Sequence, residues 1–262
     1  MDFDIVKYPR THHLEGSRLQ QGDEDLSQVP FSHIKGKYIV IEEKVDGANS
    51  AISFNDEGEL LLQSRGHYLT GGYRERHFNL FKQWANVHKE EFYKVLGSRY
   101  IMYGEWLYAK HTVYYDELPH YFMEFDVYDR VEEIFLSTKA RKELLKGLPV
   151  TSVYVLAEGK FNKLEDILKY LGRSNFISDS HIENLVNTAI TLGLDPERAK
   201  METDLGTTME GLYIKVESET EVEERLKYVR YSFLQTVFES STHWLDRPII
   251  PNKLSKDISE LF

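Results

Sequence analysis

β-Branched and aromatic residues gather in short runs along the first quarter of the chain, separated by polar residues and glycine. Such residues favour β-strands, and Asn55, Asp56 and Gly58, between the second and third runs, are typical of a tight turn. We therefore predict three consecutive strands that form a meander. Their ranges are 37–42, 50–54 and 60–64.

The hydrophobic period changes after residue 76. Apolar side chains recur at close to helical spacing as far as Leu96, and Gly97 follows as a residue that commonly ends a helix. This pattern predicts a single amphipathic helix over residues 76–96. Its apolar face consists of Phe78, Phe81, Ala85, Phe92 and Val95.

The rest of the chain mixes both periods. The further strands that we predict are 100–105, 120–129, 152–156, 211–216 and 226–231, and the further helices are 139–146, 164–171, 181–192 and 233–238. This order predicts the α+β class, with mainly antiparallel sheets flanked by helices. The strand at 120–129 is unusual because Glu124 and Asp126 stand among aromatic residues, and an ordinary core strand has no need of them.

Composition narrows the class of protein. The 262 residues are 41% hydrophobic and 29% charged, as in a globular protein, and they include no cysteine, so disulfides, thiolate metal sites and cysteine nucleophiles are excluded. No apolar run approaches the roughly 20 residues that a membrane-spanning helix needs, and the polar, acidic start does not resemble a signal peptide. We expect a cytoplasmic protein with one main domain, residues 1–262.

The formal net charge of −11 limits how the chain could bind nucleic acid. Binding to phosphates needs a face of Lys and Arg, so any such site must be a local patch. Each candidate patch taken alone is more typical of a solvated face. The candidates are Arg65, Arg74 and Arg76; Lys139, Arg141, Lys142 and Lys146; and Lys227 and Arg230.

One lysine stands where chemistry could occur. Lys44 ends a predicted apolar strand, has Glu42, Glu43 and Asp46 as neighbours, and precedes Gly47. A lysine is nucleophilic only when its amine is neutral; burial near cations or a metal favours that form, and carboxylates oppose it. The same residues also fit an ordinary surface hairpin turn. Taken alone, they leave both interpretations open.

Six short motifs in a fixed order favour the first interpretation, since together they resemble the covalent nucleotidyltransferase superfamily of ATP-dependent ligases and capping enzymes. In chain order they are Lys44-Val45-Asp46-Gly47, Ser64-Arg65-Gly66, Tyr103-Gly104-Glu105, Phe125-Asp126-Val127, Glu210-Gly211-Leu212-Tyr213-Ile214-Lys215 and Leu226-Lys227-Tyr228-Val229-Arg230. Each lies on or beside a predicted strand, which makes the series specific. The resemblance implies a nucleotidyltransferase (ATP-grasp-like ligase) core over about 37–231.

The resemblance also implies a role for each motif. Lys44 would become bonded to AMP, Arg65 would contact the nucleotide and a 5′ phosphate, and Phe125 would stack on adenine. Glu105 would hold the ribose, and Glu210 would help to position a metal. The implied nucleotide-binding set is Glu43, Lys44, Asn49, Arg65, Glu105, Phe125, Glu210, Lys215 and Lys227, and the implied catalytic set is Lys44, Asp46, Arg65, Lys215 and Lys227.

The chemistry of the residues agrees with these roles. Charge on a transferring phosphate must be met by fixed cations, for which Lys215 and Lys227 are available, and by Mg²⁺ (or Mn²⁺). Asp46, Glu105 and Glu210 carry the hard oxygen atoms that such ions prefer, and contact through water is expected because Mg²⁺ keeps much of its hydration shell.

Two features need separate treatment. Relatives often carry two lysines one residue apart in the last motif, whereas here Lys227 is followed by Arg230, and an alternating strand would point these two side chains to opposite faces. Asn49 matches a family asparagine used with the polynucleotide. No His-x-x-x-His spacing occurs, so we predict surface roles rather than zinc ligation for His12, His13, His111 and His120.

The length after the last motif favours one branch of the superfamily. Of the 262 residues, 32 follow Arg230, whereas the OB-fold that follows this core in DNA ligases and capping enzymes needs roughly 70 or more. We therefore predict no C-terminal OB-fold and a short tail over 232–262. A helical insertion over about 130–205 also resembles the RNA ligases.

The resemblance, together with the short tail, implies an ATP-dependent RNA ligase. It would join 5′-phosphate and 3′-hydroxyl RNA ends through a lysyl-AMP intermediate and an adenylated RNA end, and a partner protein could process the ends beforehand. A DNA-joining or capping enzyme of the same superfamily stays open, as does a non-catalytic RNA-binding module of the same fold. Residues 1–36 and the tail match no motif, and the sequence indicates neither the physiological RNA nor the oligomeric state.

Overall fold

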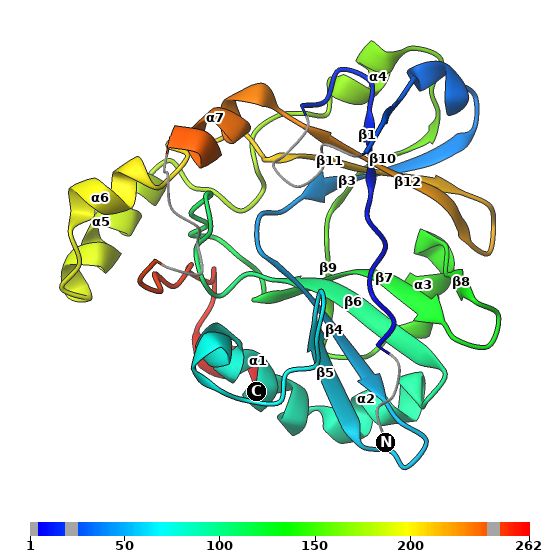
Figure 1. Ribbon diagram of the computed structural model, residues 1–262, viewed down its shortest axis with the longest axis horizontal. Helices are drawn as coiled ribbons and strands as arrows, with labels where there is room; N and C mark the ends of the chain where they lie inside the picture. The colour runs from blue at the N-terminus through cyan, green and yellow to red at the C-terminus, as the bar shows by residue number, and fades with distance from the viewer. Residues whose placement is uncertain (1–4, 19–25, 240–246) are drawn as a thin grey trace.

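Two β-sheets form the centre of the molecule. The structure is a computed structural model, and it describes residues 5–18, 26–239 and 247–262. The first sheet has the order β10-β3-β11-β12-β1-β2, with β10 Val155–Lys160, β3 Tyr38–Lys44, β11 Gly211–Glu217, β12 Val222–Val229, β1 His12–Leu14 and β2 Gln28–Val29. The second has the order β5-β4-β6-β7-β8, with β5 Leu60–Ser64, β4 Ala48–Phe54, β6 Tyr100–Trp106, β7 Phe122–Asp129 and β8 Ile134–Phe135. Figure 1 shows the first sheet above the second.

The predicted meander at the start of the core is wrong in one respect. β4 and β5 do form an antiparallel hairpin, but β3 belongs to the other sheet. The chain passes from one sheet to the other through Val45, Asp46 and Gly47. A Cβ on Gly47 would lie 2.7 Å from both a Leu107 methyl carbon and the Trp106 carbonyl oxygen, so only glycine fits this close crossing. Lys44 therefore stands where the two sheets meet.

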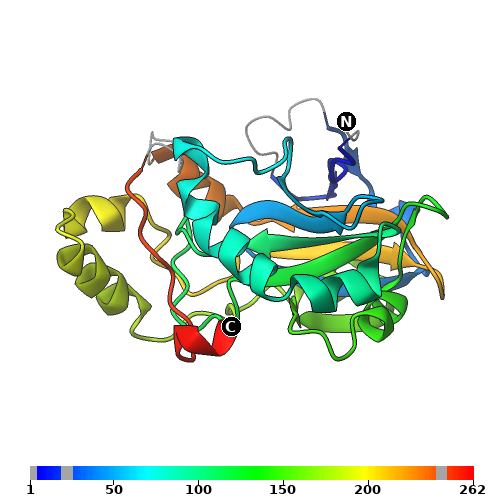
Figure 2. The same cartoon turned by 90° about the horizontal axis from the view of Figure 1, so that it is seen from below.

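The predicted helix over 76–96 is divided into three parts. A 3-10 helix, η2 (Tyr73–Phe78), leads into α1 (Asn79–Val87), and α2 (Lys89–Leu96) starts after a break at His88. The apolar period was correct, since Phe81, Trp84 and Phe92 are buried in the core that covers the second sheet. Figures 1 and 2 show α1 and α2 running along that sheet.

The predicted insertion at 130–205 is not purely helical. Its strand β10 pairs antiparallel with β3 and forms the edge of the first sheet, and β9 (Thr151–Ser152) pairs with β7, so the single strand predicted at 152–156 is two strands in two sheets. The helices of this segment are α3 Thr138–Leu144, α4 Leu164–Leu168, α5 His181–Thr191 and α6 Pro196–Met201. The α5–α6 pair stands to one side of both sheets (Figure 1).

Both ends of the chain return to the core. β1 lies parallel to β12, and after β12 the described residues contain α7 (Tyr231–Glu239) and the 3-10 helix η4 (Ile258–Leu261), without a further strand of two or more residues. Asn252 fixes the last segment, because its side chain accepts a hydrogen bond from the Tyr115 backbone N–H and donates one to the Leu107 carbonyl. None of the helices in the described ranges is long and apolar enough to cross a membrane.

Buried charges join the two sheets and account for the acidic residues of β7. Arg141, from α3, is fully buried between Glu42 of β3 and Glu124 of β7, and so does not belong to a solvated basic patch. Lys215 of β11 lies 2.9 Å from Glu42 and 3.1 Å from Asp126 of β7. Buried charges are tolerated only when they are paired in this way, and the network sets the position of one sheet against the other.

Candidate active site

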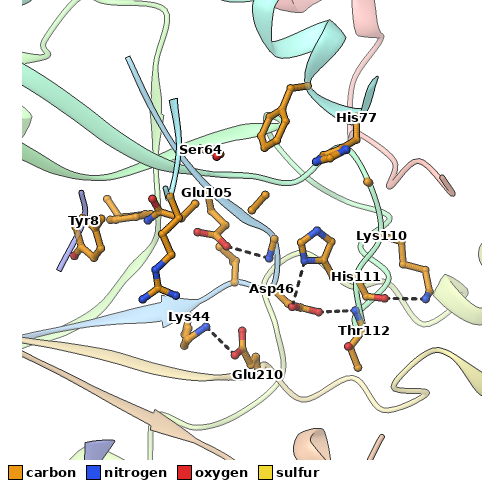
Figure 3. Close-up of a pocket in the computed structure, with 18 of the residues that line it drawn as sticks. Tyr8, Lys44, Asp46, Ser64, His77, Glu105, Lys110, His111, Thr112 and Glu210 are labelled. Atoms are coloured by element: carbon orange, nitrogen blue, oxygen red, sulfur yellow. Dashed lines mark hydrogen bonds and ion pairs between the residues drawn. The ribbon is translucent and has the colours of Figure 1, made fainter. Parts of the chain in front are cut away.

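A cavity of about 1540 Å³ opens between the two sheets. It exceeds the roughly 300–1,000 Å³ of a typical small-molecule pocket, so it has room for a nucleotide and for part of a second substrate. Figure 3 shows Tyr8 at one end of the cavity, Lys44, Glu210, Asp46 and Glu105 in the middle, and Lys110 at the other end. Of the predicted site residues, Glu43, Lys44, Asp46, Asn49, Arg65, Glu105, Phe125, Glu210 and Lys227 all line it.

Lys44 points into the cavity from the last position of β3. Gly211 is its partner in the ladder between β3 and β11, so Glu210 comes to lie beside it, and the Lys44 Nζ donates a hydrogen bond of 2.7 Å to Glu210 Oε1. Burial lowers the pKa of Lys44, but Glu210 above all, and then Glu105 and Asp46, raise it beyond its ordinary value. The amine is therefore charged at neutral pH in these surroundings.

Asp46 and Glu105 complete a group of carboxylates around this amine. Asp46 Oδ2 accepts hydrogen bonds from the backbone N–H groups of Thr112 (2.7 Å) and Val113 (2.8 Å), and Glu105 Oε1 accepts one from Gly47 N–H at 3.2 Å. Burial raises the pKa of Glu105 to about 8 against the opposing effect of Lys44, and it also raises the pKa values of Asp46 and Glu210. The three acids are thus held in an environment that disfavours their charged forms and favours a cation.

These acids suit a divalent metal only in part. In the described ranges of the chain, no three His, Cys, Asp or Glu side chains converge closely enough to hold an ion between them. Mg²⁺ is usually held by one or two carboxylates together with water and substrate phosphates, and that arrangement fits carboxylates which surround Lys44 without meeting at one point. Asp46, Glu105 and Glu210 could each supply one such contact.

Aromatic rings form the end of the cavity opposite Lys110. Phe125 of β7 and Tyr213 of β11 have ring centres 6.2 Å apart, and Tyr8 lies edge-on to Phe125 at 5.2 Å. The Tyr8 hydroxyl donates to Asp126 Oδ2 at 2.5 Å and contacts the Tyr213 hydroxyl at 2.8 Å, so the N-terminal segment is fixed here. Flat apolar faces of this kind are suited to an aromatic base.

Other predicted residues meet the cavity in different ways. Asn49 pairs with Glu105 across β4 and β6, and its buried Oδ1 accepts no hydrogen bond from the described residues. Glu43 borders the cavity, but its carboxylate accepts hydrogen bonds from the Ser174 hydroxyl and from Asn175, because it lies on the opposite face of β3 from Lys44. Arg65 is exposed at the rim.

Lys215 is the predicted site residue that the structure does not place on the cavity wall. It lies two positions beyond Tyr213 on the same face of β11, but its ammonium is fully buried, pairs with Glu42 and Asp126, and donates to the Phe125 carbonyl oxygen. Its direct role on the nucleotide is therefore not supported by its position. Lys215 supports the backbone at Phe125.

Arg225 is a cation of β12 that the sequence analysis did not consider. It stands two residues before Lys227 on the same face of the strand, but it does not line the cavity. Its Nε donates to Asp126 Oδ2 at 3.0 Å, and its guanidinium lies 3.7 Å from the centre of the Phe135 ring. Arg230 points elsewhere, as the alternation predicts, and its side chain binds Asp204 and the carbonyl oxygens of Met209 and Thr208.

The prediction that the four candidate histidines lie on the surface is wrong for three of them. His13, His111 and His120 are buried, and only His12 is exposed. His111 lines the cavity, with its Nδ1 3.9 Å from Asp46 Oδ1. Tyr8, Thr11, Lys110 and Arg247 are among the other cavity residues that lie outside every motif. The one available signal was the pair Lys110-His111 just after the strand that ends in Glu105 and Trp106.

Two sheets of mainly antiparallel strands enclose a cavity that is lined with carboxylates and contains a lysine. This arrangement is that of a nucleotidyltransferase fold. The family model for RNA ligase matches residues 37–229, and the chain belongs to the RNA ligase family. This confirms the predicted fold class and the resemblance on which it was based. No curated protein is significantly similar to the chain.

Solved structures of RNA ligases share the fold at low sequence identity. A mutant of the Naegleria gruberi RNA ligase with ATP and Mn matches at 18% identity and a TM-score of 0.55, over 88% of this chain and 58% of the other. The same ligase with PPi matches at 16% identity and a TM-score of 0.52. An archaeal ATP-dependent RNA ligase matches at 16% identity and a TM-score of 0.51, over 87% of this chain and 49% of its own. This chain thus spans about half to three-fifths of their length.

Proposed function

We propose that this protein is an ATP-dependent RNA ligase that joins 5′-phosphate to 3′-hydroxyl RNA ends by way of AMP bonded to Lys44, and that residues 1–262 form one adenylyltransferase domain. The position of Lys44 carries the proposal: its amine faces a cavity with aromatic rings at one end and carboxylates around it. The solved relatives with ATP or AMP and Mn support ATP and a divalent metal as its small-molecule partners.

In the first step Lys44 Nζ attacks the α-phosphorus of ATP, an N–P bond forms, and the bond to pyrophosphate breaks. The amine must first lose a proton, and its hydrogen bond to Glu210 Oε1 provides an acceptor within 2.7 Å. Lys227, on the cavity wall, is placed to meet charge on the transferring phosphate. A divalent metal held by one or two of Asp46, Glu105 and Glu210 would neutralise further phosphate charge.

Adenine would lie at the aromatic end, against Phe125 and beside Tyr213. Stacking is available to any base, so the choice of ATP over GTP must depend on polar groups at the base edge. Glu105, on the neighbouring strand, would then reach the ribose. Tyr8 extends this end of the cavity and brings the N-terminal segment into the nucleotide site.

The second and third steps use the remaining wall. AMP passes from Lys44 to the 5′ phosphate of RNA, and a 3′ hydroxyl then attacks that phosphate and releases AMP. Arg65 at the rim has the planar fork that suits a terminal phosphate, and the unpaired Oδ1 of Asn49 is an acceptor for a ribose or strand-end hydroxyl. The formal net charge of −11 leaves little basic surface for RNA, so a separate protein could prepare the RNA ends and help to bind them.

The test is transfer of label from α-labelled ATP to the protein. We expect label on the wild-type chain with Mg²⁺ or Mn²⁺, none on Lys44→Ala or Lys44→Arg, and full labelling on Lys142→Ala, which changes an exposed lysine of α3. Labelled protein would then be given 5′-phosphorylated RNA, the equivalent DNA, or GTP in place of ATP. Transfer to DNA or reaction with GTP would favour a DNA-joining or capping relative, and a chain without label would be a binding module.

A further inference from the structure

Two buried cations occupy the end of the cavity away from the aromatic rings. Lys110 lies just after β6, and Arg247 belongs to the segment that follows α7; both line the cavity and each is 7% exposed. Figure 3 shows Lys110 beyond Asp46 and His111 as seen from Lys44. No part of the nucleotidyltransferase motifs accounts for either residue.

The backbone holds the two cations side by side. Lys110 Nζ donates to the carbonyl oxygens of His111 (3.0 Å) and Glu202 (2.8 Å), and Arg247 Nη1 donates to the same two oxygens at 3.1 and 3.2 Å. An ammonium has three hydrogens, so these two acceptors leave Lys110 one donor for a ligand in the cavity. The shared acceptors fix both cations before any ligand arrives.

Charge around the pair favours an anion. Burial above all, and then the positive charge of Arg247, lower the pKa of Lys110 to about 7, while Asp46 and Glu202 have smaller opposite effects. Asp46 Oδ2 is already occupied by the N–H groups of Thr112 and Val113. Glu202 Oε2 lies 3.8 Å from Arg247 Nε, but the same carboxylate also pairs with Arg198 at 3.0 Å. One carboxylate divided between two arginines offsets only part of the positive charge here, so a bound anion would stabilise the Lys110–Arg247 pair.

An anion site at this end of the cavity would counteract the carboxylates in the middle of the cavity. Lys44 is surrounded by Asp46, Glu105 and Glu210, and each of these acids that is ionised would repel a triphosphate. A cationic end beyond them would draw the terminal phosphates past this group and leave the α-phosphate at Lys44.

We propose that Lys110 and Arg247 form a binding site for a terminal phosphate group, either the pyrophosphate part of ATP or the 5′-phosphate end of RNA. The inference rests on the proposed ligase function, and it adds the C-terminal segment to the site. Both sources present the same chemistry, a multiply charged phosphate whose oxygens accept from an ammonium and a guanidinium.

Direct binding separates this inference from the ligase function, because it requires no catalysis. Calorimetry with pyrophosphate would compare wild type with Lys110→Gln, which keeps two N–H donors but not the charge, and with Arg247→Met. We expect about 10- to 100-fold weaker pyrophosphate binding in both, from loss of a charged hydrogen bond, and unchanged AMP binding. Lys142→Gln is the matched control. Loss of AMP binding to the same extent would contradict a separate phosphate site.

A second experiment identifies whether the bound phosphate group belongs to ATP or to RNA. Fluorescence anisotropy would compare a 5′-phosphorylated RNA with its 5′-hydroxyl counterpart. Weaker pyrophosphate binding with an unchanged preference for 5′-phosphate assigns the site to ATP; a lost preference assigns it to RNA. If the folded variants lose neither, the pair merely holds the C-terminal segment and the inference is wrong.

If the variants fail to fold, a measurement on the wild-type chain can test the inference in their place. The side-chain nitrogen signal of Lys110, followed by NMR over pH, should show a pKa that rises when pyrophosphate is added, since a bound anion favours the ammonium. A Lys110 signal that titrates identically with and without pyrophosphate and with 5′-phosphorylated RNA would overturn the inference. A chain that binds pyrophosphate here but never takes label from ATP would retain the site and lose the ligase function.

Discussion

Lys44 and Glu210 form an ion pair of 2.7 Å at the junction of β3 and β11, with the lysine 21% and the glutamate 2% exposed. The contact fixes the amine in the cavity, but it also keeps it protonated, because Glu210 is the strongest of the groups that raise the pKa of Lys44. In the reaction that we propose, a lysine held in this way stays protonated and inactive until nucleotide or metal changes its surroundings. The ion pair would then both position the amine and prevent premature reaction.

Replacement of Glu210 tests this double role. In Glu210→Gln the pKa of Lys44 should fall, because the largest charge that raises it is gone, yet label transfer from ATP should slow by at least about tenfold, since the proton acceptor is lost. The two effects are measured separately, by NMR titration of Lys44 and by the rate of labelling. Glu183→Gln, an exposed glutamate of α5, is the control. Labelling of Glu210→Gln at the wild-type rate would show that Glu210 is not the proton acceptor.

Glu105 predicts how stability depends on pH. Its pKa is about 8 in the folded chain and near the ordinary 4.5 when unfolded, so between these values the folded state keeps a proton that the unfolded state loses. The contribution of Glu105 to stability is full below about pH 4.5 and is lost as pH rises through about 8. Glu105→Gln, which mimics the protonated form, should leave the melting temperature nearly unchanged at pH 4.5 and raise it at pH 8.5.

The size of this effect can be stated for a chain of this length. Each kcal/mol gained should raise the melting temperature by about 2–4 °C. Mg²⁺ should raise the melting temperature of wild type at pH 8.5 more than that of Glu105→Gln, because a cation favours the charged carboxylate. Equal melting temperatures of wild type and variant at pH 8.5 would show that Glu105 is not held protonated by burial.

The sequence predicted the residues whose surroundings are local. Lys44, Glu105 and Phe125 stand at strand ends or on alternating strands, so their direction follows from the element that carries them. Lys215 also lies on the predicted face of its strand, but Glu42 and Asp126 capture its ammonium. Such pairing across sheets depends on tertiary packing, which periodicity does not contain.

The same reason explains which parts of the cavity were missed. Tyr8 and Arg247 reach the site from segments with no motif, 36 residues before and 203 residues after Lys44, and only the folded chain brings them together. The strand β3 was correctly predicted, but its place in a different sheet from β4 was not, because a short glycine-containing link between strands usually makes a hairpin.

The buried arginine between the sheets predicts a large loss of stability. Arg141→Met would leave Glu42 and Glu124 buried without their shared cation, and removal of one partner from a buried ion pair typically costs about 3–5 kcal/mol. Urea unfolding would measure the change, with Lys142→Met, next in the chain and exposed, as the control. A loss below about 1 kcal/mol would mean that the two acids become protonated or hydrated at little cost.

Gly211 links the fold to the reaction that we propose. A Cβ at this position would collide with the backbone carbonyl of Tyr228 on the neighbouring strand, so Gly211→Ala must push β11 and β12 apart. Glu210 precedes this residue, and Lys44 is its ladder partner, so the shift would disturb the Lys44–Glu210 contact. We expect loss of stability together with at least about tenfold slower label transfer, since small displacements of reacting groups are costly.

The matched control for Gly211 is Gly172→Ala. The nearest atom to a Cβ at Gly172 is the Tyr170 carbonyl oxygen at 4.0 Å, so the substitution is accommodated without movement. Melting curves and labelling rates of the two variants should therefore differ clearly, with Gly172→Ala close to wild type in both. The opposite result is a Gly211→Ala variant that melts and takes label like wild type. That result would show that β11 and β12 can separate enough to hold a methyl group, and it would contradict the inference that the position of Glu210 depends on their close packing.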